Sequence, residues 1–228
     1  MAQIMTDIRT ASPEQDQYGL LAAHGFDEAF FGLWVERDDL DELAGSLRLD
    51  ARSRRDVRLI EEAATMTDWS VPFDEKDSLW IGPHSPGWSV VISTSGPETG
   101  GWWLSSGNRG MLVVSWHRDV DGLSDLDYYR DGNLVAELPA LPSGELLPGQ
   151  LFEPYAQGLP PGGDPNMGQE RLAHAFLTIV GRMTGRFIDE DWLRTPGRAY
   201  GFPLDDTNGQ SSGPARSASC ALGPWTSA

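Results

Sequence analysis

The sequence predicts an α+β fold in which an antiparallel meander of about five to six strands packs against two to three helices. Three observations lead to this prediction. Apolar residues recur at helical spacing in the first third of the chain and again between residues 169 and 183. Between residues 79 and 138, glycine, proline and serine separate short runs of tryptophan, valine and isoleucine, as in strands joined by turns. The 228 residues are 39% hydrophobic, enough for one sizeable core.

The first predicted elements are a buried strand and two helices. Residues 30–35 read Phe-Phe-Gly-Leu-Trp-Val, a short apolar run rich in aromatic side chains. Asp38 is a suitable N-cap for the helix that follows. Its apolar positions stand at i, i+3, i+4 and i+7: Leu40, Leu43, Ala44 and Leu47. A second amphipathic helix is predicted over 56–66 from the spacing of its aliphatic residues.

The predicted sheet begins at Leu79. Its candidate strands are 79–81, 88–92, 111–116, 125–129 and 134–138. Asp131-Gly132 is expected to form a tight turn between the last two, because Asp-Gly supplies the positive φ angles of a two-residue hairpin. We interpret 139–165, which is rich in proline, as an irregular connection rather than a domain linker.

A long helix and a short one complete the predicted fold. The long helix covers 169–183, where apolar side chains make a continuous stripe, and Thr184-Gly185 would end it. A short helical segment is expected over 188–193. We therefore divide the chain into a flexible N-terminus (1–17), a single α+β domain (18–203) and a flexible C-terminal tail (204–228) that is rich in glycine, serine and proline.

The charge balance limits the classes of partner. Lys and Arg number 17 against 34 Asp and Glu, a formal net charge of −17. Such a surface repels nucleic acid and anionic membranes, whereas it attracts basic proteins and cationic ligands, or simply keeps the protein in solution. Cys220 is the only cysteine, and the N-terminus lacks the pattern of a signal peptide. We expect a cytoplasmic protein.

Motifs for common chemistries are missing from the sequence. The four histidines have no metal-binding spacing: His24, His84, His117 and His174. The acidic stretch 119–127 lacks the glycine and glutamate positions of an EF-hand loop. The chain has neither a Gly-x-Ser-x-Gly elbow nor a glycine-rich phosphate loop. We expect no metal and no cofactor; His117, at the end of a predicted strand, is the candidate catalytic residue if the protein is an enzyme.

The tryptophans are the remaining candidates for a binding site. Trp102 and Trp103 follow two glycines, and adjacent residues of a regular strand cannot both point inward, so at least one ring would be exposed unless the loop folds back over both. Exposed tryptophan beside acids suits an interface, or a pocket for a cationic or aromatic ligand. The candidate binding residues are Trp102, Trp103, Trp116, Asp119, Asp121, Asp125 and Tyr128.

Several ordered blocks resemble a known family. They are FFGLWVERDDLDELAGSL, WIG, PGWSVVI, LSSG, VVSWHRDVDGLSDLDYYRDGNLVAEL and RLAHAFLTIVGRMTGRFIDEDWL, which together span roughly residues 26–195. This pattern resembles a family of uncharacterised actinobacterial proteins that is defined only as a domain of unknown function. The resemblance implies no activity and no catalytic residues. The layout is also loosely similar to small cytoplasmic immunity proteins, at the level of fold alone.

Two functional hypotheses follow. The first is a non-enzymatic interaction protein that binds a basic protein partner by electrostatic steering and aromatic anchors. The most specific version of this hypothesis is that the partner is a toxin, which the protein neutralises. The second is a small enzyme or ligand-binding protein of actinobacterial secondary metabolism with an aromatic pocket near Trp88, Trp116 and His117. A pocket lined by Trp116 and His117 would favour the second hypothesis, and a flat acidic face with exposed Trp102 the first.

Overall fold

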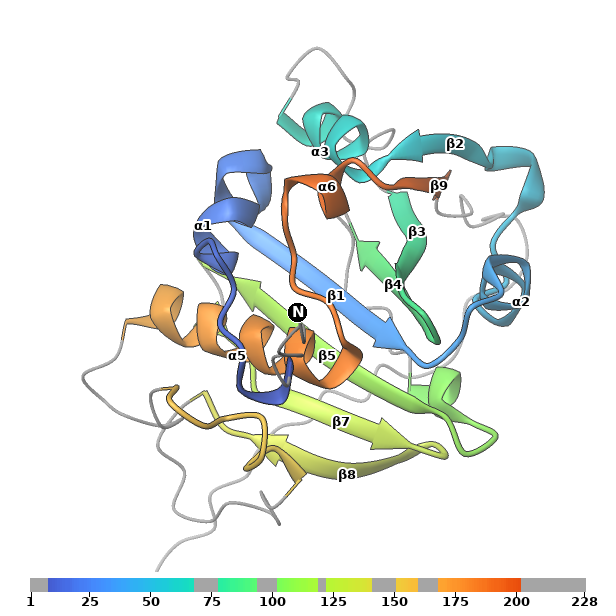
Figure 1. Ribbon diagram of the computed structural model, residues 1–228. Coiled ribbons are helices and arrows are strands. Elements are labelled where there is room, and N and C mark those ends of the chain that lie inside the picture. The colour runs from blue at the N-terminus through green and yellow to red at the C-terminus, as the bar shows by residue number, and fades with distance from the viewer. Residues whose placement is uncertain are drawn as a thin grey trace, which may run out of the picture.

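The computed structural model describes residues 8–67, 78–93, 102–118, 122–140, 151–159 and 168–201 (Figure 1). Within these residues nine strands form one sheet, and each of its strand pairs is antiparallel. Helices complete the α+β fold that the sequence predicts. The sheet has more strands than the five to six expected, because three of its strands have no apolar run of their own.

The sheet is not a simple meander. Its order is β2 (Arg55–Arg58), β9 (Pro196–Gly201), β3 (Ser78–Ser85), β4 (Trp88–Ser93), β1 (Ala29–Val35), β5 (Gly110–His117), β7 (Leu126–Arg130) and β8 (Asn133–Leu138). A short strand, β6 (Gly122–Leu123), also pairs with β5. The strand β1 lies between β4 and β5, and β9 lies between β2 and β3. Segments distant in sequence are therefore neighbours at the centre and at one edge.

Helices cover the two faces of the sheet unequally. The helices α1 (Gln17–Leu21), α3 (Leu59–Thr67), α5 (Gln169–Thr184) and α6 (Glu190–Leu193) contribute to one core cluster, and Figure 1 shows α5 lying across the sheet. The helix α2 (Leu40–Ser46) packs Leu43 and Ala44 into a smaller cluster on the opposite face. We call these the α5 face and the α2 face.

The alternation of side chains along β1 explains why its sequence is apolar at nearly every position. Phe30 and Trp34 belong to the cluster on the α5 face, whereas Phe31, Leu33 and Val35 belong to the cluster on the α2 face. Successive side chains of a strand point to opposite faces. Since both faces are covered, the strand reads as a continuous apolar run rather than as an alternation.

The predictions that rest on local chemistry are confirmed. Asp131 and Gly132, with φ angles of 51° and 77°, join β7 to β8 as a two-residue hairpin turn requires. Gly185, with a φ of 89°, ends α5, and its N–H donates to the carbonyl of Gly181. The predicted strands 30–35, 88–92 and 111–116 correspond to β1, β4 and β5.

Two predicted boundaries are wrong. The N-cap of α2 is Asp39, whose Oδ1 accepts from the N–H groups of Asp41 and Glu42. Asp38 instead accepts from the Gly87 N–H at 2.6 Å and so ties down the β3–β4 turn. The helix predicted over 56–66 begins only at Leu59, because residues 55–58 form the polar edge strand β2 against β9.

Part of the N-terminus that was expected to be flexible makes specific contacts. Gln17 is fully buried, and its side-chain amide exchanges two hydrogen bonds of 2.8 Å with the backbone of Ile188. Asp16 caps α1, which is absent from the predicted elements. The tail 204–228 lies outside the described residues. Among those that are described, no helix is long and apolar enough to cross a membrane.

Candidate functional site

The structure separates the three residues of the aromatic pocket expected from the sequence. His117 pairs with Ala29 at one end of β1, whereas Ser89, next to Trp88, pairs with Val35 at the other end. At about 3.3 Å per residue, the two ends lie roughly 20 Å apart. His117 is exposed and lies on the opposite side of the strand from its buried neighbour Trp116. A pocket shared by Trp88, Trp116 and His117 is therefore not formed.

Tyr128 and Asp125 have structural roles. Tyr128 is only 6% exposed within the core of the α5 face, and its hydroxyl accepts from Nε of Arg130 at 3.0 Å. Such a ring is already packed and is not an exposed anchor for a partner. Asp125 accepts from the N–H of Ala140 at 2.7 Å, so its carboxylate holds the chain beyond β8.

Four other candidates lie wholly or partly outside the described residues. Trp102 and Trp103 begin a short 3-10 helix, Trp102–Ser105, but their side chains lie outside the described part of the chain, as do Asp119 and Asp121. Ser105 at the end of that helix accepts from the N–H of Asp131, which places it beside the β7–β8 turn. The start of β5 lies there, whereas Trp116 lies near its other end.

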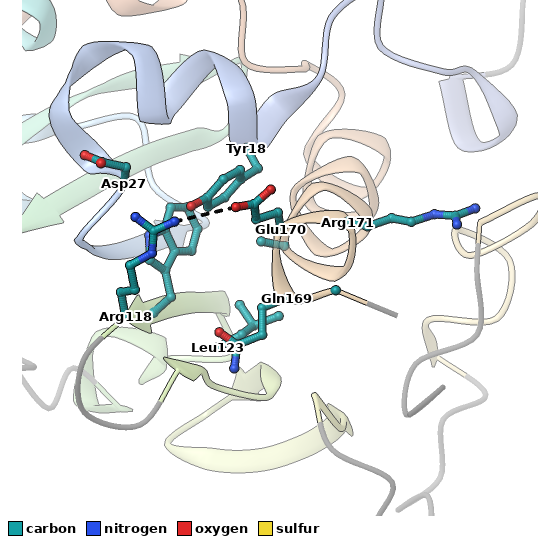
Figure 2. Close-up of a pocket in the computed structure, with 10 residues that line it drawn as sticks. Tyr18, Asp27, Arg118, Leu123, Gln169, Glu170 and Arg171 are labelled. Carbon is teal, nitrogen blue, oxygen red and sulfur yellow. Dashed lines mark ion pairs between the residues drawn. The ribbon is translucent and has the colours of Figure 1, made fainter. Parts of the chain in front are cut away.

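Trp116 lines a cavity of about 410 Å³, which we call the Trp116 pocket (Figure 2). The pocket lies between α1, the end of β5, β6 and the first turn of α5. Its described lining residues are Tyr18, Asp27, Trp116, Arg118, Leu123, Gly168, Gln169, Glu170, Arg171 and Ala173. A volume of a few hundred Å³ is in the range of small-molecule sites.

Two aromatic rings form the wall of the pocket. The rings of Tyr18 and Trp116 have centroids 5.4 Å apart, with their planes at 53°. Trp116 is stacked on Phe30 at 4.5 Å, and its Nε1 donates to the carbonyl of Phe26 at 2.9 Å. The indole is held on one face and at its polar edge, so the wall is formed before any ligand arrives.

The rest of the interior is apolar, with an amide at its edge. Leu123 and Ala173 are 6% and 2% exposed and contribute methyl and methylene groups. Gly122 has a φ of 71°, and a Cβ there would overlap the side-chain amide of Gln169. The positive φ favours glycine at this position, and the Gln169 side chain lies against the strand there.

Charged groups surround the mouth of the pocket. Arg118 lies 3.7 Å from Glu28 through Nη1 and 3.7 Å from Glu170 through Nη2. Figure 2 shows Arg118 and Glu170 beside Tyr18, while Arg171 extends away from them. Asp27 adds a further carboxylate to the lining. Both ion pairs are long and half-exposed, so each contributes little to stability.

Burial raises the pKa of the Tyr18 phenol above its usual value of 10.0, and the nearby carboxylates of Glu170, Asp27 and Glu28 add to this effect while Arg118 opposes it. The phenol is therefore neutral at physiological pH and offers one O–H donor and an acceptor oxygen. It is suited to binding through its ring face and its hydroxyl rather than to attack on a substrate.

A second, polar cavity of about 480 Å³, which we call the acidic hollow, lies where the N-terminal segment meets α6. It is lined by Ser12, Glu14, Gln15, Phe187, Ile188, Asp189, Glu190 and Asp191. Two of its carboxylates are paired with arginines: Glu190 lies 2.8 Å from Arg194, and Asp189 lies 3.6 Å from Arg186. Glu190 also lies 3.3 Å from Nε2 of His24. Within the described residues, no group of three or more metal-ligating side chains is placed to hold an ion.

Sequence reasoning found Trp116 but missed most of the Trp116 pocket. Tyr18 is the first residue of the predicted domain, in a stretch for which no element was predicted, although Asp16 as an N-cap and the pair Leu20-Leu21 were signals of a short helix there. Gln169 and Glu170 were recognised only as the start of a helix. Gln169 and Glu170 lie close to β6 only in the folded protein, because more than 40 residues separate them from β6 in the sequence.

Searches for similar proteins found no matching family model, curated protein or solved structure. The resemblance to an uncharacterised actinobacterial family consequently stays a prediction, and the Trp116 pocket has to be interpreted from its own chemistry.

Proposed function

We propose that this chain is a binding protein that holds a small ligand with an aromatic or apolar body in the Trp116 pocket. One observation carries the proposal: a cavity of about 410 Å³ has a wall of two packed aromatic rings and keeps its charged groups at the mouth. Sites for small molecules are typically concave and mostly apolar, with a few polar groups that orient the ligand.

The fixed position of Trp116 supports binding of a flat ligand. Phe30 and the Phe26 carbonyl already hold the indole, which is 6% exposed but lines the cavity, so a ligand that contacts its exposed part does not have to order that side chain. An aromatic pair contributes about 0.5–1.5 kcal/mol beyond the area that it buries. Tyr18 offers a second ring and a hydroxyl on the adjacent helix.

The test is a screen of small aromatic compounds by ligand-detected NMR, followed by calorimetry of the best binder against a Tyr18→Ala variant. Removal of the Tyr18 ring should weaken binding at least about fivefold, which corresponds to about 1 kcal/mol. The control is Tyr129→Ala, because Tyr129 is also partly buried but packs on the α2 face. Equal affinity of wild type and the Tyr18 variant would contradict this site.

A second function, suggested first by the charge of −17, is favoured by the acidic hollow. We propose, as this second function, that the protein acts in the cytoplasm and binds a basic protein. If the protein is immunity-like, that basic partner is a toxin. Glu14 and Asp191 would face lysine or arginine side chains of the partner, and long-range attraction would speed the encounter.

That second function is tested by capture of partners on the tagged protein at low and high salt. A basic partner retained at about 50 mM salt should be lost at about 500 mM, where screening shortens the Debye length to a few ångström. Combined substitution of Glu14→Gln and Asp191→Asn should weaken capture of the same partner. Salt-independent capture, or capture unaffected by these two substitutions, would refute the acidic hollow as the docking surface.

A further inference from the structure

The charges at the Trp116 pocket are unbalanced toward the negative. Asp27 and Glu170 line it, Glu28 lies next to Asp27 in sequence, and Arg118 lies between Glu28 and Glu170. Arg171, although part of the lining, extends away from this group in Figure 2. Among the described residues, Arg118 thus lies between the carboxylates of Glu28 and Glu170, and Asp27 adds a third carboxylate to the lining beside the two aromatic rings.

The Arg118 guanidinium is weakly held. Each of its two ion pairs spans 3.7 Å, and 51% of its side-chain surface is exposed. Only its backbone is fixed firmly, since its N–H donates to the carbonyl of Glu28 at 2.8 Å. A competing cation can displace a guanidinium of this kind from Glu170 at low cost, because the pair is already solvated.

We propose that the Trp116 pocket selects an organic cation, a guanidinium or primary ammonium group on an aromatic or apolar stem, which replaces the Arg118 guanidinium beside Glu170. This inference rests on the proposed ligand-binding function and specifies its ligand class. The stem lies against Trp116 and Tyr18, whose ring faces also attract cations, and the charged end meets carboxylates.

The opposite charge preference has weaker support. The first turn of α5 contributes a partial positive charge, equivalent to about half an elementary charge, which would attract an anion. Glu170 stands in that same turn and opposes this effect. An anion would also have to approach the carboxylates of Asp27 and Glu170, whereas an incoming cation is repelled by the half-exposed Arg118 guanidinium, which it can displace.

The required chemistry has two sources, a free amine or guanidine and a lysine or arginine side chain of another protein. Both place a cation on an apolar stem. They differ in the stem, because a free ligand can carry an aromatic ring that fills the space along Trp116, whereas the side chains of lysine and arginine are linear.

The first experiment compares three probes of similar shape by calorimetry: 2-phenylethylammonium, 2-phenylethanol and phenylacetate. The ammonium probe should bind about 3–10 times more tightly than the alcohol, and phenylacetate more weakly than both, because a partly exposed charge pair adds only a modest attraction. A fourth probe, N-acetylarginine amide, separates the sources: tighter binding than 2-phenylethylammonium supports a protein side chain, and weaker binding supports a free amine.

The second experiment changes the charges. Glu170→Gln should weaken 2-phenylethylammonium binding about 3–10-fold, and Arg118→Gln should strengthen it by a similar factor. The pair Arg58 and Glu61 offers matched controls, because it is also an exposed ion pair, 3.6 Å long, and lies where the edge strand β2 leads into α3. Arg58→Gln and Glu61→Gln should change the affinity for 2-phenylethylammonium less than about twofold, since salt screens charges that lie far from the Trp116 pocket.

The outcomes distinguish two claims, that the Trp116 pocket binds small ligands and that it prefers cations. If the alcohol binds as tightly as the ammonium probe and Tyr18→Ala weakens both, the pocket binds ligands but the charge selectivity is wrong. If phenylacetate binds best and Arg118→Gln abolishes its binding, the pocket selects anions. If none of the four probes binds, the Trp116 pocket is not the site of function and both claims fail.

Discussion

At the scale of single residues, Trp80 illustrates how the sheet accommodates a large ring. Trp80 is fully buried, and its Nε1 donates to the carbonyl of Val57 at 3.0 Å. Its ring lies over Gly82 on the same strand and over Gly197 on β9, so closely that a Cβ at either glycine would overlap the ring. The absence of a side chain at the two glycines therefore leaves room for the indole ring of Trp80.

Two alanine substitutions at glycine should have opposite signs. Gly82→Ala should lower the free energy of unfolding by about 1–3 kcal/mol, because the new methyl group forces Trp80 to move within a packed core. Gly45→Ala should raise it by about 0.5–1 kcal/mol, because Gly45 is an exposed position of α2 with open space around it. Urea denaturation measures both, and an unchanged Gly82 variant would refute the role of the ring.

His84 is a second residue whose chemistry is set by burial. It is 1% exposed; its Nδ1 accepts from Nε1 of Trp192 at 2.8 Å, so the proton of the neutral ring lies on Nε2 and is donated to Thr184 at 2.8 Å. Burial, with a smaller contribution from the charge of Arg186, lowers the pKa of His84 from 6.5 to about 3. The folded protein therefore keeps this ring neutral in mild acid.

This shift predicts a loss of stability in acid. Between pH 6.5 and about 3 the unfolded chain binds a proton on His84 that the folded chain does not, so stability is fully present above pH 6.5 and declines below it. Between pH 7 and pH 5 the loss from this group should be about 2 kcal/mol. His84→Gln should remove that part of the loss, whereas the exposed control His117→Gln should keep it.

Urea unfolding at pH 7 and pH 5 measures the contribution of His84 to the free energy of unfolding. An NMR titration of the His84 ring in the wild-type protein is an independent readout that does not require the variant to fold. A ring that titrates near pH 6.5 would contradict the assigned environment.

At the scale of elements, α5 organises more of the molecule than its apolar stripe indicates. Arg182 near its end is 3% exposed and donates to three backbone carbonyls: Ala11 at 2.7 Å, Tyr155 at 2.6 Å and Gln157 at 3.0 Å. One guanidinium thus joins the N-terminal segment and the turns of 151–159 to the helix. The fork of donors in arginine makes this possible, since lysine has a single ammonium group.

Arg182→Lys should therefore loosen two segments together. The free energy of unfolding should fall by about 1.5–3 kcal/mol, the range for losing hydrogen bonds to a charged donor. Amide hydrogen exchange should accelerate in 8–17 and 151–159 while β1 and β5 keep their protection. Equal acceleration throughout the chain would indicate general destabilisation instead of a local role.

At the scale of the whole molecule, the order of the strands makes the two halves of the chain interdependent. The N-terminal strand β1 is central in the sheet, and β9, near the C-terminal end of the described chain, pairs with both β2 and β3. The core of the α5 face combines side chains from α1, the sheet and α5. Neither half can bury its apolar surface without the other.

We therefore expect unfolding in a single transition. Tryptophan fluorescence, to which nine tryptophans contribute, and far-UV circular dichroism should give coincident curves in urea. Separate midpoints would show that part of the sheet unfolds independently, contrary to the topology.

The parts of the fold that the sequence predicts correctly are those decided by neighbouring residues. The β7–β8 turn follows from Asp131-Gly132, α5 from its periodic apolar stripe, and β1 from its run of apolar residues. Each of these signals is complete within about 20 residues, so the physical cause and the pattern occupy the same segment.

The remaining features depend on partners that are distant in sequence. Arg55–Arg58 is a strand only because β9 supplies its hydrogen bonds. Its sequence has no alternation of apolar and polar residues that would predict a strand. Likewise Tyr18, Trp116 and Glu170 meet only because α1 and α5 pack together across the end of β5. Composition and local pattern determined the fold class, the hairpin and the principal helix; tertiary packing decided the sheet order and the Trp116 pocket, because long-range contacts bring these residues together.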